Sequence, residues 1–217
     1  MPSHVSAERA QRLRRYWDKH ARNYDKQMAF FERRLFADGR HWVCSQASGE
    51  VLEVAIGTGR NLPYYPEGVL LTGIEFSPAM LELARRQADQ LGLEVDLRLG
   101  DAQALDLPDA CFDTVVCTLS LCAIPDERRA VAEMKRVLRP GGRLLLLDHV
   151  AGAPRWVRAI QWLLELVTRP LGEEHMRRRP LLQVQAEGFE IQQRERSKLG
   201  IVERLTARKP SEPTPRS

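Results

Sequence analysis

The sequence of 217 residues predicts an α/β fold: a mostly parallel seven-stranded sheet with helices on both faces and a C-terminal antiparallel hairpin. The first observation is a series of short apolar runs bounded by Gly, Pro or Asp, at residues 50–56, 70–76, 94–100, 112–121 and 142–150. The second is that segments of helical period separate these runs. Strands that are apolar throughout and are joined by helices are typical of a parallel sheet covered on both faces.

The two clearest helices have recognisable ends. In 77–92, Ser77 stands at the N-cap position, Pro78 at the first helical position and Gly92 just past the end. These are the residue types that begin and end helices. In 125–142, apolar residues recur with helical spacing until the run Pro-Gly-Gly, which predicts the end of the helix.

The third observation is a change of pattern near the C-terminus. Residues 188–197 and 198–210 alternate apolar and polar side chains and are separated only by a short turn. This pattern favours an antiparallel hairpin over another helical crossover. Residues 211–217 are rich in Pro and Ser, and we expect them to form a disordered tail.

Composition limits the class of protein. The chain is 43% hydrophobic and 29% charged, with a net charge of +4, which is typical of one folded globular domain. It contains no apolar run of the roughly 18 residues that a membrane-spanning helix needs, and no signal peptide, so we expect a cytoplasmic protein. The four cysteines form no Cys-x-x-Cys pair and are interpreted as reduced structural thiols. The sequence has no nucleic-acid-binding module, and its basic segments indicate either solvated helix faces or a contact with phospholipid.

The stretch EVLEVAIGTGRNLPYY, residues 50–65, combines the first strand with a turn that contains Gly57 and Gly59. In open parallel sheets ligands bind beyond the carboxyl ends of the strands. A dinucleotide fingerprint would need a third glycine where this chain has Leu62, and the Gly-Lys-Ser/Thr of a phosphate-binding loop is absent. The pattern therefore argues against a nicotinamide dinucleotide, although a dehydrogenase remains an alternative.

Three carboxylates near strand ends indicate another ligand. Glu53 lies inside an apolar strand, where an ionised side chain is costly unless it serves a polar site. Glu75 ends the second strand, the position from which an acid accepts the hydroxyls of a ribose. Asp101 follows the third strand and could receive the amine of an adenine. A cationic cofactor that carries ribose and adenine fits this set.

The motifs VLEVAIGTG, LTGIEFSPAML, LRLGDAQALDLPDACFDTVVC and EMKRVLRPGGRLLLLDHV resemble those of class I S-adenosylmethionine-dependent methyltransferases of the small ubiquinone-biosynthesis-like type. The resemblance implies a Rossmann-like fold, S-adenosyl-L-methionine as cofactor and S-adenosyl-L-homocysteine as product. The sequence departs from the family pattern at Ala55, where the first motif usually has glycine.

The resemblance also implies a role for individual residues. Backbone near the glycine turn contacts the methionine part, Glu75 holds the ribose, and the acid after the third strand reads the adenine amine. The implied cofactor residues are Ala55, Gly57, Gly59, Glu75, Phe76, Met80, Asp101, Ala102, Thr118, Leu119 and Leu121, with Glu53 beneath the turn.

The segments outside these motifs are expected to form lids. Residues 1–45 predict an N-terminal helical lid, in which Tyr16 and Tyr24 either close over the cofactor or only pack between helices. Residues 46–210 form the methyltransferase domain. Within it, 151–182 are interpreted as an acceptor-lid insertion, whose helical stripe from Trp156 to Val167 either covers the sheet or contacts a hydrophobic acceptor or a membrane surface.

The acceptor is left open by the sequence. The motifs are similar to those of animal alkyl-thiol methyltransferases, of bacterial phosphatidylethanolamine N-methyltransferases and of quinone C-methyltransferases. We therefore expect a small-molecule or lipid acceptor that is small and hydrophobic, with His149 as a candidate base or, alternatively, as a structural histidine. No metal-ligand spacing is present, so no metal is expected. A non-catalytic S-adenosylmethionine-binding regulator is the alternative from another class, and the sequence does not indicate an oligomeric state.

Overall fold

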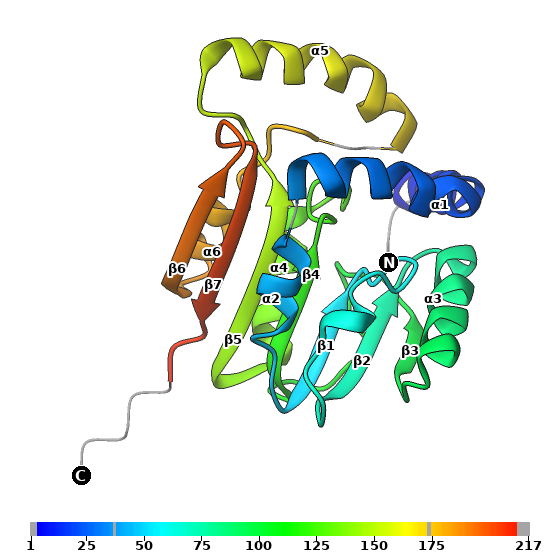
Figure 1. The fold of residues 1–217 in the computed structure, drawn as a ribbon, viewed down its shortest axis with the longest axis vertical. Helices are drawn as coiled ribbons and strands as arrows, with labels where there is room; N and C mark the ends of the chain where they lie inside the picture. The colour runs from blue at the N-terminus through cyan, green and yellow to red at the C-terminus, as the bar shows by residue number, and fades with distance from the viewer. Residues whose placement is uncertain (1–3, 37, 173–174, 212–217) are drawn as a thin grey trace.

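The computed structural model describes residues 4–36, 38–172 and 175–211 and contains one seven-stranded sheet (Figure 1). The strand order is β3-β2-β1-β4-β5-β7-β6. The strands are β1 (Glu50–Val54), β2 (Leu70–Glu75), β3 (Asp96–Leu99), β4 (Phe112–Thr118), β5 (Leu138–His149), β6 (Glu190–Ser197) and β7 (Val202–Arg208).

The sheet confirms the predicted fold class. The first strand pairs in parallel with β2 and β4, β2 with β3, and β4 with β5. The hairpin of β6 and β7 is antiparallel, and β7 also runs antiparallel to β5. Strands β2 and β3 lie on one side of β1, whereas β4 and β5 lie on the other, so the switch point of the sheet falls between β1 and β4. Ligands bind beyond the carboxyl ends of the strands at such a point.

Helix α3 begins and ends as its sequence predicts, whereas α4 ends before the predicted boundary. Helix α3 (Pro78–Leu91) starts after Ser77, whose side-chain oxygen accepts a hydrogen bond from the backbone N–H of Met80, and it stops at Gly92 in the left-handed conformation. Helix α4 (Glu127–Val137) is capped by Asp126, and strand β5 follows immediately at Leu138. The predicted Pro-Gly-Gly boundary therefore lies inside the irregular start of β5, where the pairing with β4 shifts register.

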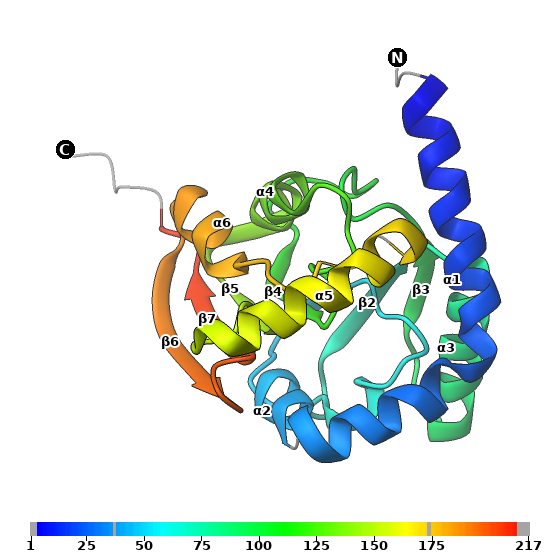
Figure 2. The same ribbon diagram turned by 90° about the horizontal axis from the view of Figure 1, so that it is seen from above.

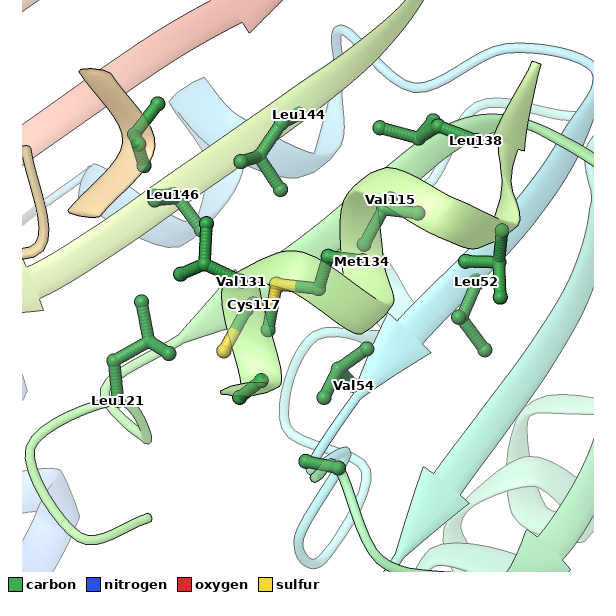
Figure 3. Packing of buried hydrophobic residues seen from close by; sticks show 14 of the residues in the cluster. Leu52, Val54, Val115, Cys117, Leu121, Val131, Met134, Leu138, Leu144 and Leu146 are labelled. Atoms are coloured by element: carbon green, nitrogen blue, oxygen red, sulfur yellow. The ribbon is translucent and has the colours of Figure 1, made fainter. Parts of the chain in front are cut away.

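Two hydrophobic cores lie on opposite faces of the sheet, as the alternation of side chains in each strand requires. One core joins α4 to the strands through fully buried residues such as Met134, Leu144 and Leu52 (Figure 3). The other contains residues of α2 (Gly39–Cys44) and α3 packed on Val51, Leu145 and their neighbours. Helices thus pack on both faces of the sheet in the described part of the chain.

Helices α1 (His4–Phe31) and α5 (Arg155–Gly172) cross the carboxyl edge of the sheet (Figure 2). Two aspartates attach α1 to the domain. The Asp18 carboxylate accepts hydrogen bonds from the Ser77 hydroxyl at 2.5 Å and from the backbone N–H of Ala79, and Asp25 accepts one from the Thr58 hydroxyl at 2.6 Å. The N-terminal helix is therefore joined to both α3 and the glycine turn.

Two features of the C-terminal half differ from the sequence-based expectations. Most of the α5 stripe does not cover the sheet, which was one of its two expected roles: Trp156, Ile160 and Leu163 are exposed, although Val157 is buried. The acidic side chain of Glu165 is also buried. The short helix α6 (Pro180–Ala186) was not predicted, although it buries Val184 against α4 and the sheet. Of the predicted tail, residues 212–217 lie outside the described residues.

Candidate active site

A cavity of about 710 Å³ opens at the carboxyl edge, between the strand ends and α1. Its walls come from the turns after β1, β2, β3 and β4 and from one side of α1. The predicted site residues among its lining are Tyr24, Ala55, Gly57, Glu75, Phe76, Met80, Asp101, Ala102, Thr118 and Leu119. Residues separated by up to a hundred positions in the sequence are thus brought to one cavity by the parallel topology.

Glu75 connects two walls of the cavity. One of its carboxylate oxygens accepts the backbone N–H of Gly57 at 2.9 Å, and the other accepts the backbone N–H of Ser77 at 2.8 Å. Burial raises the pKa of Glu75 above its ordinary value, while the donated N–H groups act in the opposite direction. Each oxygen keeps a second acceptor position, so the carboxylate can bind a pair of hydroxyl groups from the cavity side.

The next wall combines apolar side chains with an acid. Phe76 and Met80 line the cavity beyond Glu75, and the Arg14 guanidinium lies 4.7 Å from the centre of the Phe76 ring. Asp101 lies across from them at the end of β3. Its carboxylate accepts the backbone N–H and the side-chain amide of Gln103, at 2.9 and 3.0 Å. Gln103 also lines the cavity, so a ligand amine must share Asp101 with it.

A buried polar network lies beneath the glycine turn. Glu53 accepts hydrogen bonds from the Asn61 amide at 2.7 Å and from the Tyr65 hydroxyl at 2.8 Å. The same Asn61 bonds to Thr118 and accepts a bond from Arg40, which also donates to Thr118. Burial raises the pKa of Glu53 to about 7. The network fixes the turn after β1 against the end of β4.

The two glycines of the turn have different roles. Both have positive φ, 62° for Gly57 and 82° for Gly59. A Cβ at Gly57 would meet no atom within 4 Å, so this position leaves open space at the cavity. A Cβ at Gly59 would lie 2.9 Å from Leu62 and 3.2 Å from the backbone of Ala84, so Gly59 allows the turn to pack against α3 and does not line the cavity.

Two residues with a strained backbone lie at the cavity. Ala55 has φ 56° and Leu119 has φ 54°, both in the left-handed region that non-glycine residues seldom adopt. They follow the ends of the paired strands β1 and β4, and both line the cavity. Strained residues of this kind occur at functional sites, where the surrounding structure holds them. Ala55, the departure from the motif, thus keeps the conformation that a glycine would supply at lower cost.

Several predicted residues lie outside the cavity lining. Tyr16 packs on His20 and Trp17 within α1, with ring centroids 4.0 and 5.2 Å away. Leu121 is buried in the core, and Glu53 lies in the network below the turn. On α1, the residues that reach the cavity besides Tyr24 are Arg9, Ala10, Leu13 and Trp17.

His149 ends β5 outside the described cavity, next to two other polar groups. The Asp148 carboxylate accepts the backbone N–H of His149 at 2.8 Å, and burial raises the pKa of Asp148. Potential ligand atoms of Cys122, Asp148 and His149 lie within 4.8 Å of one another, the one such group among the described residues. The expectation of no metal, like that of a catalytic role for His149, stays a prediction.

Some of the lining residues stand in no recognisable motif. Arg40 is buried, lines the cavity and reaches the end of β4 from helix α2. Its segment, DGRHW, contains no motif, so only the three-dimensional contact identifies it. Trp17 and Gln103 were likewise missed, although Trp17 falls beside Tyr16 in a segment already expected to form a lid.

Comparison with known proteins agrees with this geometry. The model of the methyltransferase domain family matches residues 52–146, which run from β1 into β5. The chain is 42% identical over 126 residues to a phosphatidylethanolamine N-methyltransferase of Cereibacter sphaeroides, covering 57% of this chain and 62% of that protein. It is 34% identical over 131 residues to the human thiol S-methyltransferase TMT1A, covering 59% of this chain and 54% of that protein.

A third relative is the demethylmenaquinone methyltransferase of Deinococcus radiodurans, 44% identical over 101 residues, which are 45% of this chain and 42% of that protein. The match spans about half the length of these curated relatives. In residues 52–146 the chain is therefore similar to the methyltransferase domain family, and the similarity supports a class I methyltransferase whose cofactor is S-adenosylmethionine.

Solved structures share the fold. An S-adenosylmethionine-dependent methyltransferase of Thermotoga maritima superposes with a TM-score of 0.67, at 23% identity, over 89% of this chain and 99% of that chain. The [4+2]-cyclase SpnF gives a TM-score of 0.64 at 24% identity, over 80% of this chain and 79% of that chain. Since a cyclase has this fold too, the particular reaction must be argued from the site.

The network predicts a pH-dependent stability. Because the pKa of Glu53 is about 7 in the folded state and near 4.5 in the unfolded chain, the folded state binds the additional proton between these values. The stability that the protonated Glu53 side chain allows is fully present below pH 4.5. It is lost as the pH rises through 7, because the buried carboxyl group then ionises. Glu53→Gln should therefore gain stability relative to the wild type between pH 5 and pH 8, by roughly 3 kcal/mol at most.

Guanidinium unfolding of both proteins at the two pH values measures this difference. The control is Glu94→Gln, which changes an exposed acid. The difference in unfolding free energy between this variant and the wild type should be the same at pH 5 and pH 8. An equal effect of Glu53→Gln at pH 5 and pH 8 would contradict the assignment.

Proposed function

We propose that this protein transfers the methyl group of S-adenosylmethionine to a small, hydrophobic acceptor. The observation that carries the proposal is the convergence of Glu75, Asp101 and the strained turn at Ala55 on one cavity. The similarity to the methyltransferase domain family supports S-adenosylmethionine as the cofactor, and the acceptor is inferred from the relatives and from the lining. We further propose that the enzyme works in the cytoplasm.

The lining suggests how each part of the cofactor is held. The Glu75 carboxylate accepts the two ribose hydroxyls, and the adenine ring lies against Phe76 and Met80 with its amine at Asp101. Arg40 supplies positive charge for the carboxylate of the methionine part, beside Ala55 and Gly57. In this arrangement Trp17, Tyr24 and Leu13 of α1 cover the cofactor from solvent, the role expected of a lid.

The sulfonium of the bound cofactor is an activated methyl donor, so the protein need not create a reactive group. Its contribution is alignment of the acceptor with the methyl carbon and exclusion of water. Backbone after β4, at Leu119 and Ser120, borders the place where the methyl group would lie. A thiol acceptor must lose a proton before attack, and His149 is the candidate base because it is the last residue of the neighbouring strand, β5.

A thiol or another small apolar molecule is our first choice of acceptor. The segment 112–151, which contains the Cys-Thr-Leu-x-Leu-Cys run and the Asp-His-Val-Ala ending, carries the similarity to the thiol methyltransferases. Phosphatidylethanolamine nitrogen and a quinone ring carbon are the alternatives offered by the other relatives. A regulator that binds S-adenosylmethionine without transferring its methyl group is the alternative from another class.

The cofactor site is tested by Glu75→Gln. The substitution retains the shape of the side chain but removes a charged acceptor, and hydrogen bonds to charged groups are stronger by about 1–2 kcal/mol than neutral ones. Calorimetric titration should therefore show S-adenosylmethionine affinity lowered about ten- to a hundredfold. Glu94→Gln should bind as the wild type does, and an unchanged affinity in Glu75→Gln would refute the assignment of Glu75.

The acceptor is tested by incubating the protein and S-adenosylmethionine with an alkyl thiol, phosphatidylethanolamine vesicles, a catechol and a quinol. Mass spectrometry should detect addition of one methyl group to the thiol together with release of S-adenosylhomocysteine. If only the lipid or only the quinol is methylated, that molecule is the acceptor and the thiol proposal is wrong. Binding of the cofactor without product from any acceptor would favour the regulator.

A further inference from the structure

Helix α5 exposes a large apolar surface, which we call the α5 apolar face. Its side chains are between 48% and 61% exposed, and they are Trp156, Ile160, Trp162, Leu163, Leu164, Leu166 and Val167. Folded proteins rarely leave so many large apolar side chains together in water unless the patch binds a partner. None of these residues lines the described cavity, so the cofactor does not account for them.

The orientation of α5 is fixed by the polar side of the helix, which faces inward. The buried Gln161 amide donates to the backbone oxygens of Val150 and Met176 at 2.9 and 3.1 Å, and its oxygen accepts the backbone N–H of Gly152 at 2.8 Å. Glu165 accepts hydrogen bonds from the backbone and the guanidinium of Arg177 at 2.8 and 2.9 Å. Rotating the helix to bury its apolar side would break all of these bonds.

Positive charge surrounds the α5 apolar face. Arg155 and Arg169 are exposed at the two ends of the helix. Helix α1 contacts α5 and borders it in Figure 2. Among its described side chains, six basic ones are exposed, compared with two acidic ones, Glu8 and Asp25. The six are Arg9, Arg12, Arg15, Lys19, Arg22 and Lys26. Glu173 and Glu174 follow α5 in the sequence but lie outside the described residues.

We propose that the α5 apolar face docks on a membrane surface that contains anionic phospholipids. An amphipathic helix with tryptophan and leucine on one side and basic residues around it binds in the interfacial plane of such a bilayer. The mode is peripheral, since no helix in the described part of the chain is long and apolar enough to cross a membrane. Two copies paired through this face would bring the same basic borders together, which disfavours self-association.

Docking in this way has a consequence for the site, and this step rests on the proposed function. Because α5 crosses the carboxyl edge of the sheet, the membrane would lie on the side of the molecule where the cavity is found (Figures 1 and 2). A hydrophobic acceptor dissolved in the bilayer could then enter without crossing water. The chain would collect its acceptor from the membrane while the cofactor arrives from solution.

The test is co-sedimentation of the full chain with vesicles. Binding should be at least tenfold stronger to vesicles of phosphatidylcholine with phosphatidylglycerol than to phosphatidylcholine alone, and should weaken as salt is raised. The variant Trp162→Ser/Leu163→Ser/Leu166→Ser should lose binding at least tenfold. The control Leu70→Ser/Leu91→Ser/Leu93→Ser changes exposed leucines at the opposite, amino edge of the sheet and should bind as the wild type does.

Each other outcome contradicts the proposal. The proposal is overturned if the wild-type protein binds neither kind of vesicle. It is also overturned if the α5 variant and the control lose vesicle binding to the same extent. A dimer that dissociates on changing the three α5 residues, measured by light scattering, would identify a second copy as the occupant. Calorimetric titration of S-adenosylmethionine separates the two proposals: vesicle binding without cofactor binding would leave this inference intact and refute the proposed function.

Discussion

The buried polar network beneath the glycine turn is the constraint on which the site depends. Glu53 cannot lie in the centre of an apolar sheet without partners, and the partners it finds, Asn61 and Tyr65, belong to the turn that follows its own strand. Asn61 and Arg40 extend the contact to Thr118 at the end of β4. The need to satisfy one buried carboxyl group thereby fixes the walls of the cavity relative to one another.

The walls in turn hold conformations that an isolated chain would avoid. Ala55 and Leu119 remain at positive φ because the network and the strand pairing on either side fix the adjacent backbone. Glu75 then connects the turn after β1 to the start of α3, where Asp18 also attaches α1. The shape of the cavity walls and the placement of α1 therefore depend on the same few carboxylates, which accept hydrogen bonds from backbone N–H groups and hydroxyls.

Much of this could be predicted from the sequence because it is local. The parallel strands, the caps of α3 and the acids at strand ends follow from periodicity and from position relative to a glycine turn. Arg40, Trp17 and Gln103 could not be predicted, since their roles come from contacts between distant segments. The sequence left the orientation of α5 open for a related reason: hydrophobic period cannot show that Gln161 and Glu165 have buried partners, which turn the polar side inward.

The central claim is that the cavity is a binding site for S-adenosylmethionine organised by Glu75. The most direct measurement is a crystal structure of the full chain with S-adenosylhomocysteine. We expect both ribose hydroxyls to lie within about 3 Å of the Glu75 carboxylate, with the adenine against Phe76 and its amine at Asp101. A nucleoside bound elsewhere, or one whose ribose makes no hydrogen bond to Glu75, would contradict the account.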